Sequence, residues 1–399
     1  MKRYDIIIIG AGISGLSLAH YCVGEGFKPL VLEKDNRAGG TFHTHRFDGE
    51  ASDFWIELGA HTCYNSYRNL IGILEDRRML DRLRRREKVP FKMLINNQIK
   101  SIPSQINFLE LLFSAPRIFS LKKRGQSIES YYSKIVGKRN FRTVFEPFFN
   151  AVPSQKANDF PAEILFKKRP RRKDIMKSFT FDGGIQSVAD SIVSEQGVEI
   201  LAGKEVDEVE PGKDGFSVKT TDGAVYESAF LASAIPPTAA AQLLRKAFPD
   251  ISGLLSKIQV AAIESVGVAV KKDAVSLEPV AGIIPANNSF YSVVSRDTVR
   301  HDRFRGFTFH FKPGIMDGEA KLKQIGDLLG VHRDQLNFMA GKDNLLPSIK
   351  VGHHRLVNKI DGLLGGGRLL LTGNYFGGIA IEDCVSRSLD EYQRLKKMT

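Results

Sequence analysis

Three glycines and one acidic residue near the N-terminus have the types and the spacing of a nucleotide site. Gly10, Gly12 and Gly15 follow directly on an apolar run, residues 4–9, and Glu33 ends the next apolar run. In this arrangement the first glycine allows a tight turn, the second lets a pyrophosphate approach the backbone, and the third lets a helix pack closely on the strand. The helix N-terminus then binds the phosphates, and the acid accepts hydrogen bonds from a ribose. The pattern predicts a dinucleotide site.

A second glycine stretch favours FAD over NAD as that dinucleotide. The pair Gly39-Gly40 begins six residues past Glu33. Such a pair is no part of an NAD-binding pattern and is typical of FAD enzymes, in which the chain folds back along the dinucleotide. Residues 57–61 read Glu-Leu-Gly-Ala-His, and in such enzymes this stretch places small residues against the flavin.

The C-terminal part carries a third stretch of the same kind. Residues 371–380 read Leu-Thr-Gly-Asn-Tyr-Phe-Gly-Gly-Ile-Ala and continue into Ile-Glu-Asp-Cys-Val. This stretch resembles the protoporphyrinogen oxidase signature, and the N-terminal third resembles the superfamily of flavin amine oxidases, protoporphyrinogen oxidases and phytoene desaturases. Residues 181–186, 234–236 and 346–353 also match superfamily positions. The resemblance covers the FAD-binding part, whereas the substrate-binding part matches only loosely.

The resemblance implies an α/β fold: a Rossmann-like FAD-binding domain of the glutathione reductase and p-hydroxybenzoate hydroxylase type, with an inserted α+β substrate domain. The discontinuous FAD-binding domain is expected at residues 1–67, 175–262 and 351–399, and the substrate-binding domain at 68–174 and 263–350. FAD is expected to be bound non-covalently, because Cys384 lies past the position at which monoamine oxidases attach it. The expected cofactor contacts are Gly10, Gly12, Ile13, Ser14, Gly15, Glu33, Lys34, Gly39, Gly40, Thr41, Gly59, Ala60, His61, Val206, Ala234, Gly373, Asn374, Ile379 and Ala380.

Several residues depart from the superfamily pattern. Thr41 stands where most relatives have an arginine after the glycine pair, and Asn374 where most have an aspartate. Ser348-Ile349 replace the Gln-Tyr of the oxidase motif. These departures weaken the assignment of the substrate more than the assignment of the cofactor.

Catalytic side chains are few, as flavin chemistry allows. Flavin N5 takes a hydride from carbon, and O2 or another acceptor reoxidises the cofactor, so the protein mainly orients the substrate and shields the site. His61 is a candidate polar group beside the flavin, and Asn150 a candidate at the wall of the substrate domain; for each, a structural role is the alternative. His43 and His45 alternate like strand residues, but no acid or third ligand accompanies them, so no metal site is expected.

These residues need a βαβ unit and a second region to position them. Residues 4–9 and 27–32 read as buried strands around a helix at 16–23. Residues 68–174 read as helical, aromatic and basic. The later strands are expected at 206–209, 216–220, 225–232, 266–270, 307–311 and 369–371, with helices at 320–329 and from about 381.

Composition places the chain among ordinary globular proteins. It has 399 residues, of which 42% are hydrophobic and 26% charged, and its net charge is +12. Disordered, collagen-like and coiled-coil classes are excluded. The three separated cysteines form no Cys-x-x-Cys pair, which favours a reducing compartment. No apolar run reaches the ~18 residues of a spanning helix, and we expect a cytoplasmic protein.

The basic excess is clustered in residues 76–88, 122–124 and 167–173. Such clusters concentrate the positive electrostatic potential on one or two sides of the molecule. An anionic membrane leaflet, an acidic small molecule and a merely solvated helix face remain open as explanations, and nucleic acid ranks last because no nucleic-acid module motif is present. The apolar residues 106–113 and 118–119 beside the basic triplet are typical of an interfacial element, peripheral on the inner face of a membrane, although a buried helix explains them equally well.

The leading hypothesis is an FAD-dependent oxidase or dehydrogenase similar to protoporphyrinogen oxidase. Its small-molecule substrate would be bulky and largely apolar with acidic groups, and the oligomeric state is left open. A flavin amine oxidase or desaturase with another substrate is the first alternative. A non-redox enzyme like UDP-galactopyranose mutase, which residues 39–44 and 59–61 resemble, is the second, and a flavin-binding protein without catalysis the third.

Overall fold

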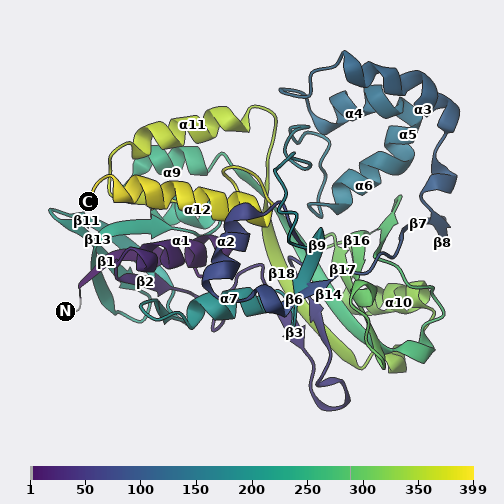
Figure 1. Cartoon of the computed structure of the whole chain (residues 1–399), viewed down its shortest axis with the longest axis horizontal. Coiled ribbons are helices and arrows are strands. Elements are labelled where there is room, and N and C mark those ends of the chain that lie inside the picture. The colour runs from purple at the N-terminus through teal and green to yellow at the C-terminus, as the bar shows by residue number, and fades with distance from the viewer. Residues whose placement is uncertain (1–2, 288) are drawn as a thin grey trace.

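The computed structural model describes residues 3–287 and 289–399, and two large sheets dominate it (Figure 1). The first sheet has the strand order β10-β2-β1-β13-β12-β11, and β19 pairs with the second half of β13. The strands β10, β2, β1, β13 and β19 run parallel, whereas β11 and β12 are antiparallel additions. Their bounds are β1 Arg3–Ile9, β2 Pro29–Leu32, β10 Glu199–Leu201, β11 Val206–Gly212, β12 Gly215–Thr220, β13 Val225–Ser233 and β19 Leu369–Leu371.

Helices cover both faces of this sheet, because its central strands are apolar on both sides. In β1, Ile6 and Ile8 face one core while Ile7 and Ile9 face the other. A strand buried on both faces has this continuous apolar sequence. One face packs α1 (Ile13–Gly24), α2 (Arg68–Asp76), α7 (Gln186–Val193) and α12 (Ile381–Lys396); the other packs α8 (Pro237–Leu243), α9 (Pro249–Leu255) and α11 (His353–Leu364).

The second large sheet has the order β18-β14-β17-β16-β15-β7-β8. One of its faces is aromatic and aliphatic, with Phe307, Phe309 and Phe311 packed towards α10 (Gly318–Leu329). The opposite face carries the alternate, partly polar residues of the same strands. The bounds are β7 Phe91–Ile95, β8 Gln98–Ser101, β14 Gln259–Lys271, β15 Gly282–Pro285, β16 Phe290–Ser295, β17 Phe304–Phe311 and β18 Phe338–Ser348.

A helical lobe with its own small core adjoins the second sheet and projects from the body of the molecule (Figure 1). It comprises α3 (Phe108–Ser114), a 3-10 helix (Ala115–Phe119), α4 (Ile128–Val136), α5 (Lys138–Asn140) and α6 (Glu146–Ala151). Its inner helix α6 contacts β15 and β16. Two small sheets complete the fold: β3 (Thr44–Arg46) with β4 (Trp55–Glu57), and β9 (Ser178–Phe181) with β5 (Cys63–Tyr64) and β6 (Leu83–Arg85).

The α/β fold class and the expected strands are confirmed, but the helical reading of residues 68–174 is wrong for β6, β7 and β8. Strand β7 pairs with β15, whose sequence lies far downstream, so its partner could not be recognised locally. The β7–β8 hairpin does have a local signal, since Asn96 and Asn97 both have positive φ, as a two-residue hairpin turn requires. The expected domain boundaries stay a prediction.

Within the described residues, no helix combines the length and the hydropathy that crossing a bilayer requires.

Candidate cofactor and substrate site

The predicted cofactor residues converge at the carboxyl ends of parallel strands. Gly10 follows β1, Glu33 follows β2, Ala234 follows β13, and Gly373 follows β19 after one intervening residue. The Gly10 amide donates to the Leu32 carbonyl (2.8 Å) and the Ala234 amide to the Ile9 carbonyl (2.8 Å), so the strand ends are tied together. Nucleotides bind at this edge of open α/β sheets.

The first glycine loop leaves the start of α1 open to a ligand. Gly10 has φ of +100°, and a Cβ on Gly15 would lie 1.9 Å from the Gly10 carbonyl oxygen, so both positions require glycine. Gly12 is the N-cap of α1, has no capping side chain, and a Cβ there would meet no atom within 4 Å. The space beside Gly12 is thus open at an uncapped helix end, which suits a phosphate.

The second glycine loop lies directly over the first. The Gly39 amide donates to the Ala11 carbonyl (2.7 Å), and a Cβ on Gly40 would lie 3.1 Å from the Cα of Gly12. Arg37 holds this loop by donating to the carbonyls of Ala38 (2.8 Å), Gly40 (2.9 Å) and Phe42 (2.7 Å).

The next expected stretch packs against the residue that follows the glycine pair. The Ala60 amide donates to the Thr41 carbonyl (3.0 Å). A Cβ on Gly59 would lie 2.2 Å from that oxygen. The stretch containing Gly59, Ala60 and His61 is thereby joined to the glycine loops.

Glu33 is buried and already holds two backbone amides. Its carboxylate accepts from Ala11 (2.7 Å) and Asp35 (3.0 Å). A carboxylate has roughly four acceptor positions, so room for a ribose diol remains. The Glu33 carbonyl accepts from the Lys204 amide (2.8 Å), which brings the start of β11 at Val206 to the same corner. Lys34 is exposed beside it.

Two cations, Lys342 and Arg37, lie near Gly40. Lys342 of β18 donates to the Gly40 carbonyl, and burial lowers its pKa to about 8, with the Arg37 charge contributing in the same direction. Burial also lowers the pKa of Arg37. Among the described residues, neither forms an ion pair within 4 Å. A buried unpaired cation is costly, so this corner suits an anion such as the diphosphate of FAD.

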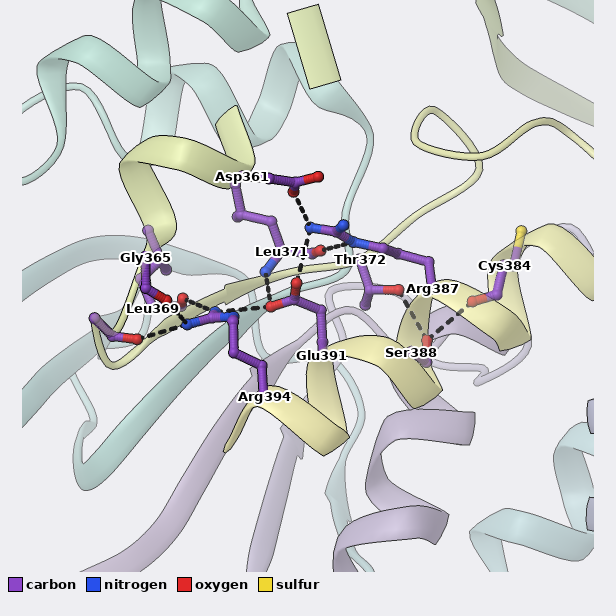
Figure 2. A network of polar contacts seen from close by, with 11 residues as sticks. Asp361, Gly365, Leu369, Leu371, Thr372, Cys384, Arg387, Ser388, Glu391 and Arg394 are labelled. Carbon is purple, nitrogen blue, oxygen red and sulfur yellow. Dashed lines mark hydrogen bonds and ion pairs between the residues drawn. The ribbon is translucent and has the colours of Figure 1, made fainter. Parts of the chain in front are cut away.

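Helix α12 fixes the C-terminal glycine stretch from the other side (Figure 2). Arg387 donates to the Leu371 carbonyl (2.9 Å) and Arg394 to the Leu369 carbonyl, and Glu391 pairs with both arginines. Ser388 donates to the Ser14 carbonyl (2.7 Å) of α1. This network fixes the end of β19 and the start of α1 relative to each other.

The residues after β19 place α12 with its N-terminus at the same corner. Gly373 and Gly378 have positive φ, +154° and +150°, and Ala380 is the N-cap of α12. Asn374 and Ile379 lie between them. Cys384 is fully inside the core, and burial raises its pKa to about 12, so the thiol stays neutral.

Part of the basic segment 167–173 is engaged in this corner. Lys167 and Arg169 bind the carboxylate of Asp383 at 2.8 Å and 2.7 Å, and Arg172 binds Glu75 at 2.8 Å. The segment has no helix in the structure. The interpretation of this segment as a solvated helix face is therefore wrong, because the segment is not helical and half of its charged side chains pair with acidic residues of α12 and α2.

A row of polar side chains crosses the second sheet on the face opposite α10. Lys342, Ser265, His310 and Ser292 are direct cross-strand partners on β18, β14, β17 and β16. Directly opposed residues point to the same face of a sheet. The row begins at the cofactor loop, where Lys342 meets Gly40, and ends on the strand that α6 contacts. The Ser292 hydroxyl is buried and has no partner within the described residues.

His310 is the centre of this row. Its Nδ1 lies 2.9 Å from the Ser265 hydroxyl, and the Asn344 amide donates to that hydroxyl (3.1 Å) and to the Leu58 carbonyl (3.1 Å). Burial lowers the pKa of His310 to about 4, so the ring is neutral near pH 7. Sequence reasoning missed Lys342, Ser265 and His310.

His61 lines a small polar cavity of about 30 Å³ together with Glu57, Arg86 and Arg296. Such a volume holds about two waters at most. Burial, and then the Arg86 charge, lowers the pKa of His61 to about 3, and its Nδ1 lies 2.7 Å from the Thr62 hydroxyl. Burial raises the pKa of Glu57 to about 7. His61 is thus a neutral group at the edge of the cofactor loops.

The remaining candidates are held elsewhere. The Asn150 side chain accepts from the Ala157 amide (2.7 Å) within the helical lobe, which accounts for it structurally. His45 lies on β3, with His43 just before it. Among the described residues, no cluster of three or more metal-ligating side chains is found. Tyr375 and Phe376 are buried in the core beneath the first sheet, away from the polar row.

Comparisons with known proteins agree with this geometry. The family model for flavin containing amine oxidoreductase matches residues 13–272. A flavin-containing amine oxidase of Danio rerio is 23% identical over 269 residues, which cover 59% of this chain and 51% of the relative. The chain thus matches about half the length of this curated relative.

Two solved structures share the fold over almost the whole chain. A protein of Exiguobacterium sp. 255-15, provisionally assigned as a protoporphyrinogen oxidase, superimposes with a TM-score of 0.82 and 18% identity, covering 100% of this chain and 99% of that one. Cyclohexylamine oxidase of Brevibacterium oxydans has a TM-score of 0.72 and 14% identity, with 98% and 99% coverage. The chain belongs to the family of flavin-containing amine oxidoreductases, and its cofactor is FAD.

Proposed function

We propose that this flavoenzyme oxidises a bulky, largely apolar small molecule that carries anionic side groups, with a porphyrinogen as the leading example. When bound, FAD supplies a hydride acceptor at N5, which O2 or another acceptor restores. The expected cofactor contacts of the glycine loops, of residues 59–61 and of the C-terminal stretch are part of this proposal, as is non-covalent binding of FAD.

The observation that carries the proposal is the Arg86 guanidinium. It donates to the hydroxyls of Thr62 and Thr298, and burial lowers its pKa. Among the described residues it has no carboxylate within ion-pair distance. Burying a cation without a counter-charge is unfavourable, so an anionic group of a ligand would stabilise this site. Lys342 and Arg37 lie at the glycine loops, so Arg86 and Arg296, which line the cavity beside His61, remain for the substrate.

Two histidines of the site are hydrogen-bonded to hydroxyl groups of neighbouring side chains. His61 and His310 are both neutral near pH 7. The Ser265 hydroxyl accepts from the side-chain NH2 of Asn344 and forms a hydrogen bond with Nδ1 of His310, whose direction depends on the tautomer of the ring. Positioning of this kind is what the chain itself contributes.

Amine oxidation is the second candidate. The family model and the names of the amine oxidases among the relatives favour it. A neutral site also suits an unprotonated amine. Against it, Tyr375 and Phe376, the aromatic pair of the C-terminal motif, are core residues and form no cage at the polar row.

Anaerobic flavin spectra with a panel of substrates test the proposal. The FAD-loaded protein is mixed with protoporphyrinogen, with cyclohexylamine or putrescine, and with a UDP-sugar. Bleaching of the oxidised flavin band by protoporphyrinogen, with recovery in air, is the expected result. Bleaching by amines alone would transfer the assignment to the second candidate. Tight UDP-sugar binding without any bleaching would overturn a redox role.

A further inference from the structure

We propose that the outer side of the helical lobe is a docking surface for an anionic lipid bilayer. The surface is an apolar ridge that consists of Phe108, Leu109, Leu112, Phe113, Ile118 and Phe119. Phe113 and Phe119 are 77% and 93% exposed, and each of the other four is at least half exposed. In Figure 1 the lobe projects from the body of the molecule, with α3 at its outer side. Contiguous apolar patches of this kind mark interaction sites.

The ridge is held outward by the local structure. The positions 108, 109, 112 and 113 form one face of α3, since residues four apart in a helix share a face. The Asn107 side chain caps α3 by accepting from the Glu110 amide (3.0 Å). Glu110 in turn accepts the amides of Arg139 and Asn140 at 2.9 Å each. Because these bonds and Leu111 fix the opposite face of α3 on the lobe, the ridge cannot turn inward.

Charge identifies the partner as an anionic surface. Residues 100–142 contain nine basic side chains and two acidic ones. None of the nine takes part in an ion pair within 4 Å among the described residues, and Glu110 is engaged with backbone amides. Arg117, Lys122 and Arg124 are exposed directly beside or just after the ridge. Large apolar groups flanked by exposed lysine and arginine are the pattern of an element that lies in a bilayer interface.

The lobe that carries the ridge also contacts the sheet of the substrate site. Its helix α6 contacts β16, which carries Ser292 at the end of the polar row. The docked lobe would then lie between the bilayer, as a source of apolar substrate, and that row. This consequence rests on the proposed function, whereas the docking surface itself does not.

Vesicle sedimentation of the FAD-loaded protein tests the surface. The wild type is expected to pellet with phosphatidylcholine vesicles that contain phosphatidylglycerol and to stay largely in the supernatant with phosphatidylcholine alone. The double variant L112S/F113S is expected to lose binding about tenfold or more, and K122Q/R124Q about thirtyfold, as the loss of two interfacial charges implies. The variant L363S changes an exposed leucine of α11 instead and should bind like the wild type.

Two readouts keep the proposal falsifiable. The flavin spectrum and the melting temperature of each variant must match the wild type, because the substitutions are at exposed positions. Wild-type protein that stays in the supernatant with anionic vesicles would overturn the proposal. It would equally be overturned if the ridge variants bound unchanged, or if they only dissociated a dimer in sedimentation velocity, since the ridge would then be a contact between two copies.

Discussion

The Oγ of Ser265 lies 2.9 Å from Nδ1 of His310, directly across two antiparallel strands of the second sheet. Ser265 in turn receives a hydrogen bond from Asn344, which also binds the Leu58 carbonyl just before Gly59. The orientation of one buried imidazole is thus coupled to the backbone of the stretch that is proposed to lie against the flavin. A buried polar chain of this kind is stabilising only when each member is satisfied.

His310 is predicted to make stability depend on pH. Its pKa is lowered to about 4, whereas an unfolded histidine has a pKa near 6.5, so the unfolded state binds more protons between these values. The free energy of unfolding should therefore be highest above pH 6.5 and fall towards pH 4, by at most about 3 kcal/mol for this residue. H310Q keeps both hydrogen-bonding functions and removes the titration. Chemical denaturation at several pH values should give a flatter profile for H310Q, and an unchanged slope would contradict the assignment.

Gly12 and Gly15 are predicted to differ sharply when each is changed to alanine. A Cβ at Gly15 would meet the Gly10 carbonyl at 1.9 Å, so G15A should lower the melting temperature of the apoprotein. A Cβ at Gly12 meets no protein atom within 4 Å, so G12A should fold normally but lose FAD affinity by at least about tenfold. G24A, at the far end of α1, is the control. Flavin fluorescence titration and apoprotein melting separate the two effects, and a G12A variant with normal FAD affinity would contradict the phosphate site.

Lys342 is predicted to contribute a charge to FAD binding. K342M should weaken FAD binding about tenfold or more, because a buried hydrogen bond from a cation to an anion is worth more than a neutral one. K342R should retain most of the affinity. Because the pKa of Lys342 is about 8 in the free protein, wild-type affinity should fall as pH rises through that value, and K342M should lack this step. K350M changes an exposed lysine near the end of the same strand and serves as the control. Equal affinities of K342M and the wild type would contradict the role.

Cys384 is predicted to carry no covalent flavin. Its thiol is buried, and burial raises its pKa, so the nucleophilic thiolate is not available. C384S should therefore bind FAD like the wild type. Acid precipitation of either protein should leave all flavin in the supernatant, and a yellow pellet from the wild type alone would contradict non-covalent binding.

The sequence predicts the cofactor half of the site far better than the substrate half. Gly10, Gly12, Gly15 and Glu33 lie within one βαβ unit, so their spacing alone brings them together. The polar row depends on register among four strands from distant segments, and Ser265 and Lys342 carry no local signal. His310 does have one, because it alternates with Phe307, Phe309 and Phe311 and so falls with Thr308 on the other face of that strand. The β7–β8 hairpin also has a local signal, the turn residues Asn96 and Asn97. The pairing of β7 with β15 has none, because the two strands are far apart in the sequence.

Arg86 is predicted to set the preference for anionic substrates. Its guanidinium is largely buried, donates to two threonine hydroxyls and has no acidic partner among the described residues, so its charge is available to a ligand. R86Q should raise the KM for a carboxylate-bearing substrate by about ten- to a hundredfold and change kcat little, because a bond present in both ground and transition states is lost. R85Q removes an exposed neighbouring arginine and should leave KM unchanged. The KM for a neutral amine should not respond to R86Q, because no anionic group is present to pair. If R86Q lowered kcat for every substrate and left KM constant, Arg86 would act on the flavin environment instead, and the anionic-substrate proposal would lose its main support.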